Sequence, residues 1–148
     1  MSRIRIAILA AGAAAALAWC RPAEAGVSLG LGADYWVDPE VGAFQLTLAV
    51  DRPLARRVTA AARVGLLVTS GPNDVAVPID LRLRMWTRRS RLYFEGLVGP
   101  WLFFDGDDWL RAHVGLGVGI LSKSMSLGLE VGWLDPSAIV GIRLGFRL

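Results

Sequence analysis

The chain has 148 residues, of which 54% are hydrophobic, with 16 basic residues, 13 acidic residues and one histidine. This length is sufficient for one domain. Much of the formal net charge of +3 belongs to the first 25 residues, because without Arg3, Arg5, Arg21 and Glu24 the chain holds 13 basic and 12 acidic residues, a net +1. The basic pI therefore gives no indication of nucleic-acid binding.

Residues 1–25 contain the three parts of a secretory signal peptide. Arg3 and Arg5 precede an apolar run from Ile6 to Trp19, and small residues end at Ala23-Glu24-Ala25. We expect export through the Sec pathway and cleavage after Ala25. The alternative is an uncleaved anchor, but the run of about 14 residues is shorter than the ~20 residues that a spanning helix needs.

Cys20 is the single cysteine. It raises the alternative of a lipoprotein, but the bulky Trp19 precedes it where lipoprotein signals carry a small residue. The sequence favours loss of Cys20 with the signal peptide. The mature chain then has no disulfide, no thiolate nucleophile and no cysteine metal site.

From Val27 onward, apolar and polar residues alternate with a period of two, which is typical of a strand with lipid on one side. The first four such segments have their apolar positions at 27–37, 44–50, 58–68 and 75–85. Segment 92–102 follows and is the least regular, and three further segments cover 110–120, 125–133 and 140–148. Eight segments of roughly ten residues match the length of tilted strands that cross the hydrocarbon layer.

Turn-forming residues separate the segments. They occur at Asp38-Pro39, Arg52-Pro53, Gly71-Pro72-Asn73-Asp74, Arg88-Arg89-Ser90, Asp105-Gly106-Asp107-Asp108, Ser122-Lys123-Ser124 and Asp135-Pro136-Ser137. The sequence therefore predicts an all-β fold for residues 26–148, an eight-stranded antiparallel up-and-down transmembrane β-barrel.

Aromatic residues gather at the two ends of the predicted strands and are missing from their middles, as the interfacial girdles of a membrane barrel require. By height, the girdle residues are Tyr35, Trp36, Phe44, Trp101, Trp109 and Trp133 at one end, and Trp86, Tyr93, Phe94 and Phe146 at the other. Because even- and odd-numbered positions of a strand point to opposite faces, some of these rings point inward, Trp36 and Trp86 among them.

In this pattern the chain resembles the small eight-stranded bacterial outer-membrane barrels, such as the transmembrane domain of outer membrane protein A. The resemblance covers the mature length and is one of pattern, without a diagnostic motif. It implies a Gram-negative outer-membrane location, outer-membrane lipids as partners, and delivery to the barrel-assembly machinery by the C-terminal strand. These families usually end on an aromatic residue, whereas here Arg147 and Leu148 follow Phe146.

The inward positions carry nearly all of the charge within the strands. The predicted interior network consists of Asp34, Arg63, Asp80, Arg82, Arg84, Glu95, Arg111, His113, Glu130 and Arg143. Eleven glycines also fall on inward positions and leave room for long side chains. An eight-stranded barrel is only just wide enough for side chains, so we expect a filled, polar interior and a structural or envelope-associated role.

In a hairpin, the residue numbers of two directly opposed residues add up to a constant, which is set by the position of the turn centre. This arithmetic predicts three acid–base pairs: Arg63 with Asp80, Arg82 with Glu95, and Glu130 with Arg143.

Two other functions are the alternatives: a lipid-modifying enzyme and a narrow pore. Lipid A deacylases are eight-stranded barrels with a lipid-facing His and a Ser two residues later, but here His113 is followed by Gly115 and parity turns His113 inward beside Glu130. The residues favour a non-enzymatic protein without a cofactor or a metal. A surface calcium site at Asp105, Asp107 and Asp108 is the alternative to a solvated loop. No protein partner is indicated.

The predicted turns alternate in charge along the chain. Asp38, Glu40, Asp74, the loop at 105–108 and Asp135 are acidic, whereas the turns with Arg52, Arg56, Arg57, Arg88, Arg89, Arg91 and Lys123 are basic. With an even number of strands, both termini share the basic end. We expect that end to face the periplasm.

Overall fold

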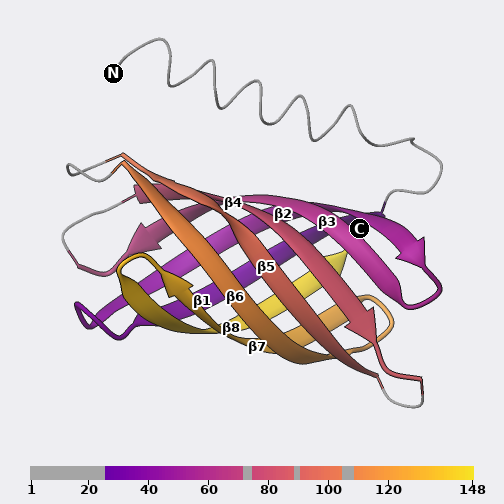
Figure 1. Cartoon of the computed structure of the whole chain (residues 1–148). Coiled ribbons are helices and arrows are strands. Elements are labelled where there is room, and N and C mark those ends of the chain that lie inside the picture. Colours follow the sequence, from indigo (N-terminus) through magenta and orange to yellow (C-terminus); the bar gives the residue numbers. More distant parts are fainter. Residues whose placement is uncertain (1–25, 72–74, 89–90, 105–108) are drawn as a thin grey trace, which may run out of the picture.

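The computed structural model describes residues 26–71, 75–88, 91–104 and 109–148, which form one closed antiparallel barrel (Figure 1). Its strands follow the sequence order: β1 (Gly26–Trp36), β2 (Val41–Ala55), β3 (Val58–Thr69), β4 (Val75–Trp86), β5 (Leu92–Phe103), β6 (Leu110–Leu121), β7 (Met125–Leu134) and β8 (Ser137–Arg147). The eight predicted strands and their up-and-down connection are confirmed. The predicted signal peptide, residues 1–25, lies outside the described residues and stays a prediction. Within the described ranges, no helix has the length and hydropathy to cross a membrane.

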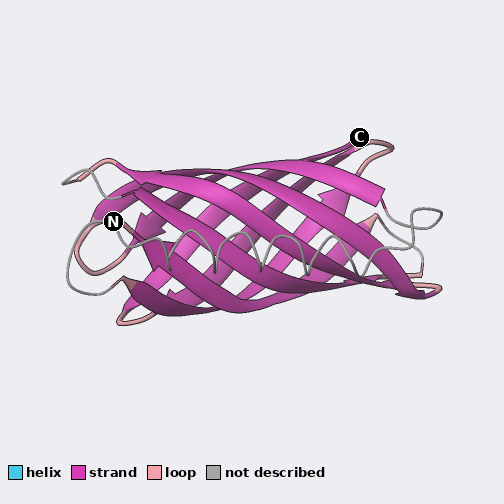
Figure 2. Cartoon of the chain, turned by 90° about the horizontal axis from the view of Figure 1, so that it is seen from above, coloured by secondary structure: helices cyan, strands magenta, loops and turns pink. Residues whose placement is uncertain are grey.

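A seam between the first and last strands closes the barrel. β1 pairs antiparallel with β8 from Ser28 opposite Arg147 to Trp36 opposite Ile139. The other seven interfaces join strands that are adjacent in sequence. Seen from above, the strands run obliquely around the barrel axis and the connections lie at its two ends (Figure 2).

The period of two separates the two faces of every strand. Outward side chains are apolar and exposed, for example Phe44 at 68%, Leu81 at 65% and Leu116 at 67%. Inward side chains are buried and many are polar or charged, for example Asp80 and Glu130 at 1% each. The barrel is therefore apolar outside and holds its buried ions inside, the reverse of a water-soluble protein.

Two predicted turns lie elsewhere than expected. Arg52-Pro53 is not a turn, because β2 continues to Ala55 and the chain reverses at Arg56 and Arg57. Pro53 lies at an irregularity in the β2–β3 register. At such a position the missing N–H of proline disturbs the hydrogen bonding between the strands little. At the last hairpin, β8 begins at Ser137, inside the predicted turn.

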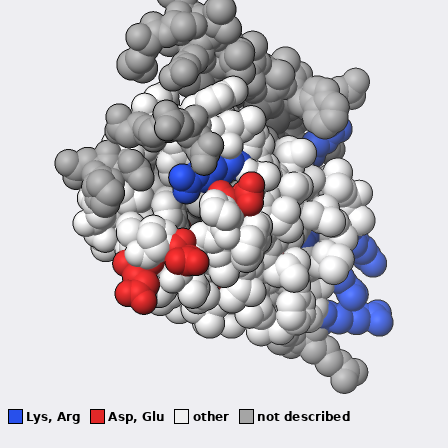
Figure 3. Space-filling model, turned by 60° about the vertical axis from the view of Figure 1, so that its left-hand side comes forward, with Lys and Arg blue, Asp and Glu red and all other residues white. Residues whose placement is uncertain are grey.

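The charges of the described turns differ between the two ends. Figure 3 shows acidic side chains on the end turned toward the viewer and most basic ones at the right-hand edge. Exposed Asp38, Glu40 and Asp135 belong to the acidic end, and exposed Arg56, Arg57, Arg88 and Lys123 to the basic end. The turn residues 72–74, 89–90 and 105–108, and with them the calcium alternative, lie outside the described residues.

Candidate functional site

The barrel interior has three layers along its axis. Near the acidic end, apolar side chains pack together into a layer that we call the apolar cap: Trp36, Ala43, Leu67, Ala76, Trp101, Phe103, Leu134 and Ile139. Trp36 and Phe103 meet edge to face with ring centroids 6.0 Å apart. The predicted interior is filled and polar, and this apolar layer near its acidic end was not predicted. The sequence does indicate this layer, because Leu67, Phe103 and Leu134 are apolar residues at inward positions of the strand pattern.

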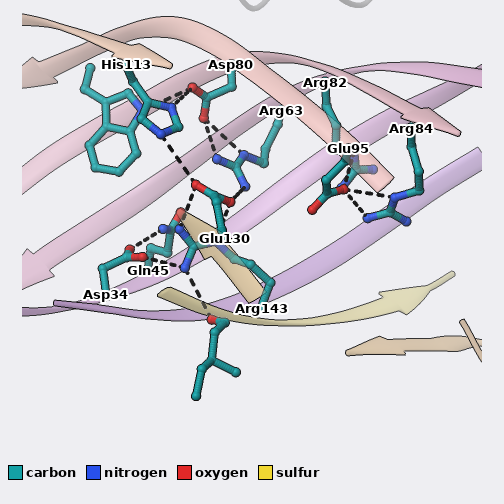
Figure 4. A network of polar contacts seen from close by, with 12 residues as sticks. Asp34, Gln45, Arg63, Asp80, Arg82, Arg84, Glu95, His113, Glu130 and Arg143 are labelled. Carbon is teal, nitrogen blue, oxygen red and sulfur yellow. Dashed lines mark hydrogen bonds and ion pairs between the residues drawn. The ribbon is translucent and has the colours of Figure 1, made fainter. Parts of the chain in front are cut away.

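Beneath the cap lies a central network of buried ions and hydrogen bonds (Figure 4). Asp80 is its first centre, because Arg63 binds its Oδ2 through Nη2 at 2.6 Å and through Nε at 3.1 Å. On Oδ1, Asp80 contacts His113 Nδ1 at 2.8 Å and accepts a hydrogen bond from Trp101 Nε1 at 3.2 Å. Three side chains, from β3, β5 and β6, are therefore fixed around this carboxylate of β4.

Glu130 is the second centre of the network. Arg143 donates to it from Nε at 3.0 Å and from Nη2 at 3.1 Å, a bidentate contact. His113 Nε2 lies 3.4 Å and Arg63 Nη1 3.7 Å from the same carboxylate. His113 thus faces a carboxylate through each ring nitrogen, with no exposed surface.

Arg143 also connects the network to the seam. Its Nη1 lies 2.6 Å from Oδ1 of Asp34 on β1, and Gln45 on β2 donates to Oδ2 of Asp34 at 2.5 Å. Gln45 occupies an inward position of the strand pattern but is not among the predicted network residues. A charged and an amide group thus hold Asp34 in place.

A second cluster, drawn on the right of Figure 4, lies nearer the basic end. Arg84 donates to Glu95 Oε2 from Nη2 at 2.8 Å and from Nε at 3.0 Å, and its guanidinium lies 4.1 Å above the Tyr93 ring centroid. Arg82 Nη2 binds Asp51 at 2.7 Å. Asp51 also accepts from Ser28 at 2.8 Å, and sequence reasoning had not placed it in the network.

The three predicted hairpin pairs have different outcomes. Arg63 lies directly opposite Asp80, as the arithmetic about Gly71-Pro72 predicts. The register about Arg88-Arg89 is wrong by two residues, because Arg84 and not Arg82 lies opposite Glu95. Arg82 keeps only a 4.0 Å contact to Glu95.

The last hairpin is also shifted by two residues, since Gly141 lies opposite Glu130. Arg143 nevertheless reaches Glu130, because its long side chain spans the diagonal between them. The remaining arginine of the predicted network, Arg111, stacks over the Phe103 ring at 4.7 Å.

Inward glycines make room for these long side chains. A Cβ atom on Gly32 would lie 2.9 Å from Arg143 Nη1, and one on Gly117 would lie 2.8 Å from Glu95 Cγ. Side chains larger than glycine at these positions would displace the ions.

The aromatic residues are divided between the two faces. Exposed rings are Tyr35, Phe44, Trp109 and Trp133 toward the acidic end and Phe94 toward the other, where Phe146 is half-buried. Trp36 is buried inside and Trp86 half-buried, as parity indicates. Tyr93 and Trp101 are also fully buried, so these four rings belong to the interior and not to an outward girdle.

Below the second cluster, the interior opens into a cavity of about 70 Å³, which we call the basic-end cavity. Its lining includes Arg82, Arg84 and Trp86, together with the exposed turn residue Lys123. Two of the buried donors here, Arg82 Nε and Trp86 Nε1, have no hydrogen-bond partner among the described residues. The interior is thus closed by the cap at one end and hollow at the other.

Comparisons with known proteins bear on the fold. No protein-family model matches the chain, and no curated protein sequence does. A structure described as de novo design of transmembrane beta-barrels is similar with a TM-score of 0.64 and 13% identity, over 83% of this chain and 95% of that one.

Two natural barrels are similar as well. The outer membrane enzyme PagL has a TM-score of 0.64 and 13% identity, over 82% of this chain and 98% of its own. The outer membrane protein OprG from Pseudomonas aeruginosa has a TM-score of 0.53 and 11% identity, over 85% and 96%. At these identities the comparisons show the fold, which is that of the small eight-stranded outer-membrane barrels predicted from the sequence pattern.

Proposed function

We propose that this protein is an integral barrel of a bacterial outer membrane, closed to ions, with a structural or envelope-associated role. The observation that carries the proposal is the reversed distribution of polarity. Exposed apolar side chains cover the outside of all eight strands, while the buried ions lie inside. An apolar surface of this extent is stable in lipid and would aggregate in water.

The strand lengths support the membrane assignment. The shortest strand, β7, has 10 residues, which corresponds to about 33 Å at the rise of an extended chain. At the tilt of about 40° that membrane barrels have, it crosses about 25 Å, the height of their apolar band. Exposed aromatic rings at Tyr35, Trp133 and Phe94 suit the two interfaces.

The closed interior argues against the pore alternative. An ion that entered from the basic end would meet the paired charges around Asp80 and Glu130 and then the apolar cap. Trp101, Leu67 and Leu134 in that cap have no exposed surface. Moving an ion through such a layer without water is strongly unfavourable.

The geometry also gives no support to the lipid-modifying alternative. His113, the single histidine, is fully buried and faces Asp80 and Glu130 rather than lipid. Residue 115 is glycine, so the serine of the deacylase pattern is missing. The likeness to PagL is therefore one of fold.

The remaining parts of the proposal concern delivery to the membrane. Residues 1–25 would direct export through the Sec pathway, and β8 would present Ile142, Leu144 and Phe146 to the barrel-assembly machinery. β8 supports this with alternating outward apolar residues. Outer-membrane lipids are the proposed partners of the outer face.

Membrane fractionation and conductance test the proposal. The protein should sediment with the outer membrane, and its gel mobility should change on heating, because a folded barrel resists detergent. Refolded protein that floats with lipid vesicles is then added to a planar bilayer, so that a missing current does not merely reflect failed insertion. We expect no steady current. A stable open level would refute the closed barrel and favour a pore, and a soluble fraction would refute the membrane assignment.

A further inference from the structure

The basic-end cavity has an excess of positive charge. Its lining includes Arg82, Arg84, Lys123 and Arg147, against the carboxylates of Asp51 and Glu95. Arg63 and Arg143 also reach it but are engaged by carboxylates of the central network. Four cations and two anions therefore surround a hollow of about 70 Å³.

The second observation is the pair of unpartnered donors in this wall. The Arg82 side chain is 10% exposed and is held in place by the 2.7 Å contact of its Nη2 with Asp51. Its Nε, however, has no hydrogen-bond acceptor among the described residues, and Glu95 Oε2 lies 4.0 Å away. Trp86 Nε1 is likewise buried without an acceptor in the described part of the chain. Buried polar groups are rarely left unpaired in proteins, so both donors indicate an acceptor that occupies the cavity.

Both side chains can only donate, because a guanidinium and an indole N–H have no acceptor. An occupant that satisfies them must therefore accept several hydrogen bonds. The volume corresponds to about five to seven water molecules at about 10–15 Å³ each, which is also room for one small tetrahedral anion. The guanidiniums of Arg82 and Arg84 are already oriented by Asp51 and Glu95, so little ordering is needed on binding.

We propose that the basic-end cavity binds an oxyanion of the phosphate class, with Arg82 Nε and Trp86 Nε1 as donors. Under the proposed topology the site opens to the periplasm, and in this respect the inference rests on the proposed function. The anion is either free phosphate or the phosphate of a lipid headgroup, which share the same recognition chemistry.

The first test is a titration of the refolded barrel with inorganic phosphate in a nonionic detergent, followed by calorimetry. Trp86→Phe keeps the aromatic ring and removes the N–H, and we expect phosphate affinity to fall about tenfold, as for the loss of one hydrogen bond to a charged group. Arg82→Lys keeps the charge and removes Nε, with a similar loss. Trp133→Phe makes the same tryptophan change at an exposed outward position, and Arg56→Gln removes a cation from the basic end outside the cavity lining. Both controls should bind as the wild type does.

The second test separates the two sources of phosphate. The barrel is reconstituted in vesicles of phosphatidylcholine with or without phosphatidylglycerol, and the protection of its tryptophan fluorescence from an aqueous quencher, to which Trp86 contributes, is compared. Protection by phosphatidylglycerol that Arg82→Lys abolishes and Arg56→Gln leaves unchanged identifies a headgroup, whereas binding of inorganic phosphate alone identifies the free anion. Heat-modifiable mobility verifies that each variant is folded. If neither probe binds, or if Trp86→Phe and Trp133→Phe bind equally, the proposal is wrong and the cavity holds only water.

Discussion

Replacement of Arg143 by Leu should destabilise the barrel more than any other single change in the central network. Arg143 makes two hydrogen bonds to Glu130, at 3.0 and 3.1 Å, and a 2.6 Å ion pair with Asp34. Both carboxylate side chains have no exposed surface. Removal of one partner from a buried ion pair costs about 3–5 kcal/mol, because the remaining charge cannot be solvated. We expect Arg143→Leu to fall in the upper part of this range.

A double-mutant cycle measures how much of this loss comes from Glu130. Glu130→Gln removes the charge but keeps the shape, so adding it to Arg143→Leu should recover about 1–3 kcal/mol of the summed single losses. Recovery should be incomplete, because Asp34 still lacks its cation and keeps only Gln45. The free energies of unfolding come from urea titrations of protein refolded in lipid vesicles.

Glu95→Gln serves as the matched control in this cycle. The ionic partners of Glu95 are Arg82 and Arg84, which it does not share with Arg143. The loss of unfolding free energy caused by Glu95→Gln should therefore add to the loss caused by Arg143→Leu within about 0.5 kcal/mol. Additive losses for Glu130→Gln as well would show that Arg143 and Glu130 do not interact, and the described network would be refuted.

Two further predictions concern topology and packing. An epitope inserted after Pro39 should be accessible on whole cells, and one inserted after Lys123 should not, because the acidic end is proposed to face outward; the reverse labelling would overturn the orientation. Gly132→Ala should cost about 1–3 kcal/mol, since its Cβ would lie 2.7 Å from the Val114 carbonyl oxygen and 3.3 Å from His113 Nε2. Gly96→Ala should cost nothing in the same urea titration, because no atom outside residues 95–97 lies within 4 Å of the position of its Cβ; equal losses for both variants would contradict the packing described.

The strand pattern was predictable because lipid on one face and ions on the other impose the same alternation on every strand. Even the least regular segment, β5, keeps Tyr93, Glu95 and Trp101 on one face, as the sequence indicates. Registers were harder to predict, since they depend on the exact turn. The Arg63–Asp80 pair was predicted correctly. At the next hairpin the register differs by two residues, so that Arg84 and not the predicted Arg82 lies opposite Glu95.

The layering of the interior was not predictable from hairpin arithmetic alone. The apolar cap joins Trp36 of β1, Leu67 of β3 and Phe103 of β5, which come together only when the barrel is closed and its strands are staggered. The diagonal contact of Arg143 with Glu130 depends likewise on side-chain length. Contacts between non-adjacent strands require the three-dimensional register, which the sequence does not state.

The seam between β1 and β8 has a consequence for the order of assembly. Every other interface forms between neighbours in the chain, so seven hairpin contacts close short loops, while the seam brings together Ser28 and Arg147, the most distant paired residues. Arg143 already has a partner on β7 in Glu130, but its contact with Asp34 can form only when the two chain ends meet. The free-energy costs of desolvating Asp34 and of closing the ring therefore arise in the same event. Closure should be the slow, cooperative step in which the sheet becomes a cylinder.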